Sequence, residues 1–445
     1  MKKTLSLMLS LLLAFAPLPV AGVAAEDAPL TGEISVQAEK AWMEYYQNVA
    51  DAIMEANPDA KINLIEMGAF DHLDTIDNTD AGNPDVADLF AIPADRIYGL
   101  TDAEVLGALD SEKLAEMVGG WEDFEAFNAG IGGNFMINDE YFAFPFNIET
   151  LIVFINAANA EATGIDLEKP IELTQVEDPA TVLLPAFDAW YGVALTNSAE
   201  VELLGREQAE DSEEFTFFSD LTADWADLPE EKQAFFTALY DYWKLNFDAN
   251  TTLFDPDAGW GYIDDTFTSG QAGVYRLGGP WDTASISEKA NDGEDLLIKP
   301  ITEITVNEKP LLHWKGGWGL AINSRIEGDE EKMALAEAMI AELVNPERAA
   351  ELFNATGKIL ENVPAEVYEE SEDLKDVDKE VIKAVIASYQ DAPARPLFNE
   401  WGRVWDTYKN AVLSWNSVKP ENVEAAYAEL QASFVAMMET LAAEQ

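Results

Sequence analysis

The segment of the chain that says most about its fold is Phe267-Thr-Ser-Gly-Gln-Ala-Gly-Val-Tyr-Arg-Leu-Gly-Gly-Pro-Trp281. Gly270 suits the positive φ at which a helix stops. Residues 272–275 predict a short buried strand, which the turn residues 278–280 end. Trp281 follows at the tip of this turn. A large aromatic side chain that a strand holds on a loop either contacts a ligand or caps the core.

The N-terminus has the pattern of a secretory signal peptide. Two lysines precede an apolar run from Leu5 to about Val20, and small residues follow as far as Ala25. This order of charged, apolar and small residues predicts a signal peptide at residues 1–25. A membrane anchor is the alternative, but the run is short and two prolines interrupt it. We therefore expect the mature protein to be extracytoplasmic, in the periplasm, at the cell surface or secreted.

The composition excludes several classes of function. The chain has no cysteine, which excludes disulfides, thiol catalysis, thiolate metal sites and a lipid-anchored cysteine. Lys plus Arg number 26 against 84 Asp plus Glu, for a formal net charge of −58. Nucleic acid and anionic membranes are poor partners for such a polyanion. Hydrophobic residues make up 48% of the chain, so the acidic residues coat a folded surface. A salty habitat and a generally acidic secreted proteome both explain this coat.

Strands and helices alternate along the chain. We predict strands at 33–37, 61–65, 86–92, 141–147, 151–155 and 318–322, and helices at 42–56, about 229–247 and 333–343, with three more helices towards the C-terminus. This βαβ rhythm favours a mostly parallel sheet with covering helices. A mature chain of about 420 residues exceeds one compact core, so two lobes are expected.

Motifs for catalysis and metal binding are missing. The only histidines are His72 and His313, and no zinc-protease, phosphate-loop or nucleophile-elbow motif is present. The acidic stretch 74–85 lacks the spacing of a calcium loop and is interpreted as a solvated loop. A carboxylate pair for glycoside hydrolysis stays open, because 84 acids offer many pairs.

Tryptophans lie near turns and element ends. Examples are Trp190, Trp260, Trp281, Trp314, Trp318, Trp401 and Trp405. Sugar-binding clefts combine flat aromatic faces with a few convergent polar groups. Trp243, by contrast, lies on the apolar face of a predicted helix and is assigned to the core.

Four segments share their pattern with one family. They are Pro84-Asp-Val-Ala-Asp-Leu-Phe-Ala-Ile-Pro-Ala-Asp-Arg96, Phe144-Pro-Phe-Asn-Ile-Glu-Thr-Leu-Ile-Val-Phe-Ile-Asn156, Phe267 to Trp281, and Gly317-Trp-Gly-Leu-Ala-Ile-Asn323. The chain resembles the extracellular solute-binding proteins of ABC importers, in the carbohydrate family that includes maltose- and maltodextrin-binding proteins. The resemblance runs from about Gly32 to the last helix.

The resemblance implies an α/β, two-lobed periplasmic-binding-protein fold of type II, in which each lobe is a mostly parallel sheet with helices and the chain ends in helices. Residues 26–147 and 316–362 would form lobe I, and residues 148–315 and 363–445 lobe II. The ligand, a maltose- or maltodextrin-type oligosaccharide, binds between the lobes and favours the closed form. A monomer would deliver it to the permease subunits of an ABC transporter, with no catalytic residue, metal or cofactor.

The resemblance also assigns site residues by position. Asp95 and Arg96 would hydrogen-bond sugar hydroxyls from lobe I, and Glu149 would do so at the hinge. Trp281 and Trp405 would stack on sugar rings, with Trp401 as an alternate. Tyr191, or its neighbour Trp190, would be a further aromatic contact. Maltose binders carry a tryptophan where this chain has Ile92-Pro93, and Glu39 and Lys40 match the first ligand loop only loosely. Asp95 and Arg96 could instead form a surface ion pair. A secreted glycoside hydrolase and a binding protein for a non-sugar solute are the alternative functions.

Overall fold

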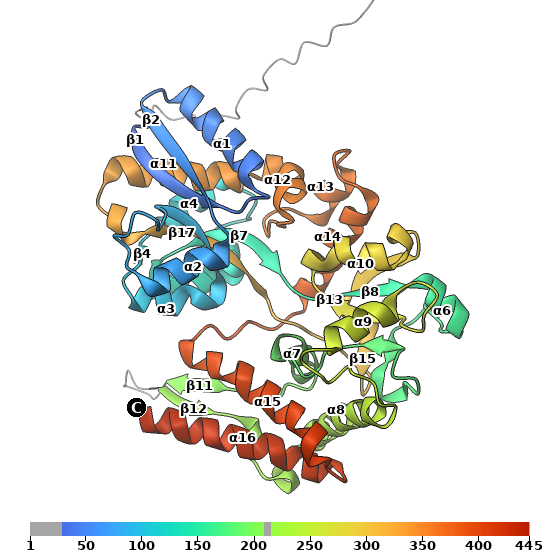
Figure 1. Ribbon diagram of the computed structural model, residues 1–445. Coiled ribbons are helices and arrows are strands. Elements are labelled where there is room, and N and C mark those ends of the chain that lie inside the picture. The colour runs from blue at the N-terminus through green and yellow to red at the C-terminus, as the bar shows by residue number, and fades with distance from the viewer. Residues whose placement is uncertain (1–28, 209–214, 445) are drawn as a thin grey trace, which may run out of the picture.

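The chain forms two α/β lobes (Figure 1). The structure is a computed structural model, and it describes residues 29–208 and 215–444. The expected signal peptide, residues 1–25, lies outside the described residues. Within these two ranges, no helix is long and apolar enough to cross a membrane.

Lobe I contains a six-stranded sheet in the order β2-β1-β3-β17-β4, with β7 also pairing with β17. The strands are β1 Gly32–Ala38, β2 Ala60–Glu66, β3 Leu89–Pro93, β4 Leu106–Gly107, β7 Phe144–Glu149 and β17 Gly316–Asn323. β3 and β17 are buried at every residue, as expected for central strands covered on both faces.

Helices cover both faces of this sheet. They are α1 Met43–Ala56, α2 Ala69–Asn78, α3 Ile97–Asp102, α4 Ser111–Val118, α5 Phe124–Ala129, α11 Glu330–Leu343 and α12 Ala349–Thr356. α1, α4, α11 and α12 pack together over one face. Side chains of α2 and α3, such as Leu73 and Ile97, form a separate core on the other face. The 3-10 turn η1, Ala94–Arg96, joins β3 to α3.

Lobe II is built on a four-stranded sheet in the order β10-β13-β8-β14. The strands are β8 Ile152–Asn156, β10 Val182–Leu183, β13 Tyr275–Gly278 and β14 Leu296–Pro300. Its helices are α6 Ala157–Thr163, α7 Ala189–Ser198, α8 Glu230–Asp248, α9 Gly259–Phe267, α10 Thr283–Lys289, α13 Ala365–Glu370, α14 Asp376–Gln390, α15 Arg403–Val418 and α16 Val423–Glu444.

Small sheets complete the fold. They are the hairpin of β5 Met136–Ile137 and β6 Glu140–Tyr141, the hairpin of β11 Gly205–Gln208 and β12 Phe215–Phe218, and the sheet of β9 Ile171–Glu172, β15 Ile304–Val306 and β16 Lys309–Pro310. Helices α15 and α16 lie side by side at the bottom of lobe II, next to β11 and β12 (Figure 1).

The two-lobed α/β fold with C-terminal helices is confirmed, but the sheets are mixed rather than mostly parallel. Among the strands of the described residues, β2-β1-β3 in lobe I and β10-β13 and β9-β15 in lobe II pair in parallel. β17 returns from the other lobe and runs antiparallel to β3, β4 and β7. β8 enters lobe II and runs antiparallel to β13 and β14. The strands that lead from one lobe into the other, β8 and β17, are therefore antiparallel to their neighbours.

Three crossings join the lobes. One runs from β7 into β8, one reaches β17 through Lys315, and one passes Ile359, whose carbonyl oxygen accepts from the Ile148 N–H at 2.9 Å. The Lys315 N–H donates to the carbonyl oxygen of Pro393 at 2.8 Å. We keep residues 26–147 with 316–362 and residues 148–315 with 363–445 as our proposed lobe boundaries.

The segment from Phe267 to Trp281 departs from its predicted form at the strand. Phe267 ends α9, and Gly270 has φ +87°, as expected for a helix stop. The strand begins at Tyr275 rather than at Ala272, because the N–H of Gly273 bonds back to the carbonyl of Thr266 at 2.9 Å in a turn. It continues through Gly278, which was expected to end it.

Candidate ligand-binding site

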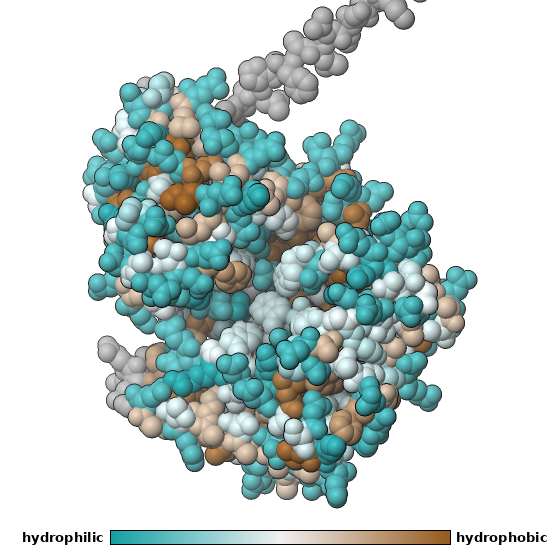
Figure 2. All heavy atoms as spheres, viewed as in Figure 1, coloured by the Kyte–Doolittle hydropathy of each residue, from teal (hydrophilic) through white to brown (hydrophobic). Residues whose placement is uncertain are grey.

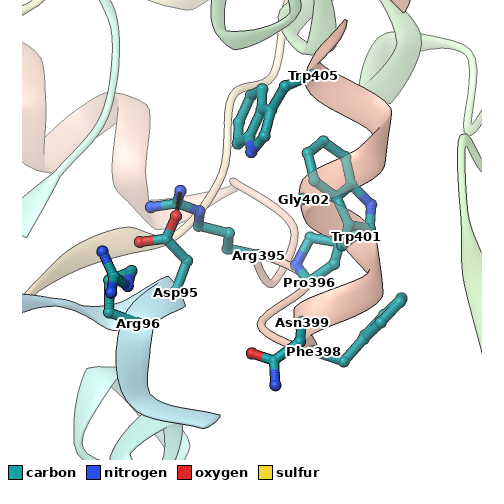
Figure 3. A pocket seen from close by; sticks show the side chains of 9 residues that line it. All are labelled: Asp95, Arg96, Arg395, Pro396, Phe398, Asn399, Trp401, Gly402 and Trp405. Atoms are coloured by element: carbon teal, nitrogen blue, oxygen red, sulfur yellow. Dashed lines mark hydrogen bonds and ion pairs between the residues drawn. The ribbon is translucent and has the colours of Figure 1, made fainter. Parts of the chain in front are cut away.

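The cleft between the lobes holds a cavity of about 260 Å³. Its walls are Asp95 and Arg96 of lobe I and Arg395, Pro396, Phe398, Asn399, Trp401, Gly402 and Trp405 of lobe II (Figure 3). The surface around the hollow is mostly hydrophilic, and residues of intermediate hydropathy line the hollow itself (Figure 2). Aromatic walls with a few polar groups suit a small polar ligand.

Asp95 and Arg96 follow β3 in the turn η1, and each pairs with a different partner. Asp95 Oδ2 accepts from Nη2 of Arg395 at 2.6 Å, across the cleft. Arg96 Nη2 donates to both carboxylate oxygens of Asp77 at 2.7 and 2.9 Å, within lobe I. The alternative of an Asp95–Arg96 surface pair is therefore wrong. Asp95 reaches lobe II, while Arg96 is held on the wall of its own lobe.

Five tryptophans form a connected cluster on the lobe II side of the cleft. The ring centroids lie 6.3 Å apart for Trp190 and Trp281, 6.4 Å for Trp190 and Trp405, 4.7 Å for Trp401 and Trp405, and 4.8 Å for Trp314 and Trp401. These edge-on and tilted contacts are the favoured arrangement of aromatic rings. Sequence reasoning named the members separately, but their grouping depends on the fold.

Trp281 has an open ring face, whereas Trp401 does not. Trp281 lies in the turn η6, Pro280–Asp282, and is 50% exposed. Gly279 lets the indole fold back over the chain, because a Cβ at that position would lie 2.2 Å from Trp281 Cζ2. Trp401 is only 4% exposed and packs beneath its neighbours. This burial disfavours Trp401 as the alternate stacking surface, whereas Trp405, for which stacking was predicted directly, is half-buried and lines the cavity.

Tyr191 is directed away from the tryptophan cluster. It is 8% exposed and packs against Trp260, with ring centroids 5.2 Å apart. Successive residues of a helix point about 100° apart, so on α7 the neighbouring Trp190 faces the cluster instead. Of the two predicted candidates, Trp190 lies in the cluster and Tyr191 does not.

His313 holds Trp190 in place through a hydrogen bond and a ring contact. Its Nε2–H donates to the Trp190 carbonyl oxygen at 2.9 Å, and the two rings meet edge-on with centroids 4.4 Å apart. Burial lowers the pKa of His313 to about 3, so the ring is neutral near pH 7. A neutral imidazole here acts as a structural support for the aromatic wall.

Glu149 lies at the end of β7, where the chain leaves lobe I. Its Oε2 accepts from Trp318 Nε1 at 3.0 Å. Lys358 lies over the Trp318 ring, with Nζ 4.7 Å from the centroid. Burial lowers the pKa of Lys358, and the charges of Glu149 and Glu39 oppose this effect. A donor and an acceptor therefore stand beside one indole ring.

Phe70 adds an aromatic face that sequence reasoning missed. It is the second residue of α2, is 65% exposed and meets Trp318 edge-on, with ring centroids 5.3 Å apart. An exposed phenylalanine against a buried tryptophan suits a ligand-facing position on lobe I. Arg395 and Lys358 were also missed. For Phe70 the sequence carries one usable signal, which is its position two residues after the turn that follows β2.

Metal chemistry has no candidate position in the described ranges, 29–208 and 215–444. Within them no group of three or more histidine or acidic side chains is arranged to hold an ion. The acidic stretch 74–85 falls on α2 and the loop after it.

A family profile described as bacterial extracellular solute-binding protein matches residues 48–384. The chain belongs to this family. Solved structures with a similar fold include the maltose-binding periplasmic protein MalE of Listeria monocytogenes in complex with maltose, at 17% identity and a TM-score of 0.67, covering 93% of this chain and 98% of that one. Another is MalX of Streptococcus pneumoniae with maltopentaose, at 17% identity and a TM-score of 0.64, covering 92% and 100%. No curated protein sequence matches the chain significantly. The family and these neighbours are binding proteins.

Proposed function

We propose that this solute-binding protein captures a sugar between its lobes, a maltose- or maltodextrin-type oligosaccharide, and delivers it to an ABC permease. The observation that carries the proposal is the pairing of open aromatic faces with polar groups on both sides of one cleft. Trp405 lines the cavity, Trp281 is exposed in the same tryptophan cluster of lobe II, and Phe70 is an exposed ring on lobe I. Glu149 and Asp95 supply acceptors beside them. Pyranose rings present apolar C–H faces and hydroxyls, which such a cleft matches.

The transport cycle needs only a difference in affinity between open and closed forms. A ligand that contacts both lobes stabilises the closed form. The permease then recognises this form and supplies the energy of transport. In this proposal the protein acts as a monomer, outside the cytoplasm after loss of residues 1–25, and has no nucleic-acid partner and no turnover of its own.

The proposed function is tested by thermal-shift measurements on the mature protein. The additives are glucose, maltose, maltotriose, maltopentaose, peptides and amino acids, each at low salt and at 1 M NaCl. A ligand at about 100 times its Kd adds about 2.7 kcal/mol of stability, which gives a clear rise in Tm. A rise with a sugar that is recovered intact supports the proposal. A shortened sugar would identify a hydrolase, and a response to peptides alone would reject the sugar assignment.

A further inference from the structure

We propose that the Asp95–Arg395 ion pair forms a bar across the cleft that limits the ligand to a short oligosaccharide. The inference rests on the proposed sugar-binding function and names the length of its ligand. The bar joins η1 of lobe I to the segment that precedes α15 of lobe II. Asp95 and Arg395 both line the cavity beside Trp405 (Figure 3).

Arg395 occupies the part of the tryptophan cluster that a long ligand would need. Its Cζ lies 5.1 Å from the ring centroid of Trp190, 5.7 Å from that of Trp314 and 6.0 Å from that of Trp405. These are cation–π distances. The guanidinium therefore lies against three of the five rings of the tryptophan cluster.

The bar is held firmly from both ends. The Arg395 side chain is only 7% exposed, and its 2.6 Å bond to Asp95 is a short charge-assisted contact. A ligand that displaced Asp95 would leave the guanidinium buried without its counter-charge, which is strongly unfavourable. The bar therefore stays in place unless a ligand supplies an equivalent acceptor.

Two more contacts join the same part of lobe I to lobe II. Asn399 Nδ2 donates to Asp102 Oδ2 at 3.2 Å, and Arg206 Nη2 donates to the Tyr98 hydroxyl at 3.4 Å. Both lobe I partners lie on α3, directly after the turn that carries Asp95. A chain of sugars extending past the bar would also have to separate these contacts. The cavity of about 260 Å³ is itself below the roughly 300–1,000 Å³ typical of larger ligands.

The experiment compares wild type with Arg395→Ala, which removes the bar, and Asp95→Asn, which breaks the ion pair by removing its negative charge. Arg403→Ala is the matched control, because Arg403 starts α15 in the same lobe and pairs with Glu444 at the surface. Circular dichroism establishes that each variant folds. If Arg395→Ala does not fold, the nearly isosteric Asp95→Asn carries the test.

The first readout is quenching of tryptophan fluorescence by acrylamide, without sugar. Removing the bar should raise the quenching constant above those of wild type and Arg403→Ala, because the rings around Arg395 become accessible. Equal quenching in the bar variants and in Arg403→Ala would overturn the bar, whatever the protein binds.

The second readout is the Kd for maltose, maltotriose and maltopentaose, measured by calorimetry. Wild type should bind the shorter sugars more tightly than maltopentaose. In the bar variants, the ratio of the Kd for maltopentaose to the Kd for maltose should fall by roughly tenfold. Wild-type binding of maltopentaose as tight as that of maltose would reject the limit on length. Absence of binding to every sugar would reject the proposed function, and the quenching result would still decide whether the bar exists.

Discussion

At the scale of single residues, Trp281 exposes half of a side chain that is highly buried in most proteins. We predict that Trp281→Ala weakens sugar binding by about 2 kcal/mol or more, because the ring is a large exposed stacking surface at the edge of the tryptophan cluster. The Tm without sugar should change little, since the exposed face has no protein partner. Calorimetric titration measures the loss. Phe218→Ala, at a 41% exposed aromatic on the β11–β12 hairpin, is the control and should leave the Kd unchanged.

His72 gives a second prediction, on pH. Its Nε2 accepts from the Ala87 N–H at 2.9 Å, and burial lowers its pKa to about 4. As the pH falls below about 6.5, His72 is therefore protonated in the unfolded state before it is protonated in the folded state. This preference lowers the free energy of unfolding. The destabilisation caused by His72→Gln should accordingly be about 2 kcal/mol smaller at pH 5 than at pH 7.

Urea unfolding at the two pH values measures this difference. Leu73→Ala is the control, because Leu73 is a buried neighbour that does not titrate. Its destabilisation should be the same at both pH values. A His72→Gln effect that is equally constant would show that His72 is not kept neutral by the fold.

The individual residues of the site differ in how far the sequence predicts them. Glu149 ends β7 and Trp281 lies in the turn after β13, positions in the fold that their local sequences predict. Arg395 and Phe70 belong to no local pattern and reach the cleft only through tertiary packing. The choice between Trp190 and Tyr191 depended on the rotation of α7, which its nearly uniform apolar sequence does not reveal.

At the scale of elements, periodicity predicted the helices better than the sheets. The helix expected at 229–247 is observed at Glu230–Asp248, since its apolar and charged faces are distinct. The strand expected at 86–92 begins at Leu89 instead. Residues 86–88 are as buried as the strand, so burial alone does not mark where the strand begins. The mixed pairing was not predictable, because β17 finds its partners β3 and β7 more than 150 residues earlier in the chain.

The turn between β13 and α10 supports a prediction about backbone space. A Cβ on Gly279 would lie 2.2 Å from the Trp281 ring, so Gly279→Ala must displace the indole. We expect this substitution to weaken sugar binding nearly as much as Trp281→Ala. Gly261→Ala on α9 is the matched control, because nothing lies within 4 Å of its Cβ position. It should stabilise the protein by about 0.5 kcal/mol and leave binding unchanged. Calorimetric titration measures the Kd of both variants. Equal Kd values for Gly279→Ala and Gly261→Ala would show that the space at Gly279 does not position the indole for binding.

At the scale of the whole molecule, the crossings and the bar act at different places. The crossings carry backbone hydrogen bonds, such as that between Ile148 and Ile359, whereas the bar and the α3 contacts are made by side chains. Side-chain contacts can break while the backbone of the hinge stays paired. Closure of the lobes is then a balance between ligand contacts and contacts within the chain itself.

The net charge of −58 gives the last prediction, on salt. Even if every Lys and Arg paired with a separate acid, 58 carboxylates would have no partner. Their mutual repulsion opposes the compact state, and it is screened as the Debye length falls from about 30 Å at 0.01 M to about 3 Å at 1 M salt. We expect the Tm to rise by roughly 5 °C over this range. NaCl, KCl and tetramethylammonium chloride at equal ionic strength should give the same rise, because screening depends on ionic strength and not on ion identity. A Tm that stays flat or falls would mean that local partners already neutralise the acidic coat.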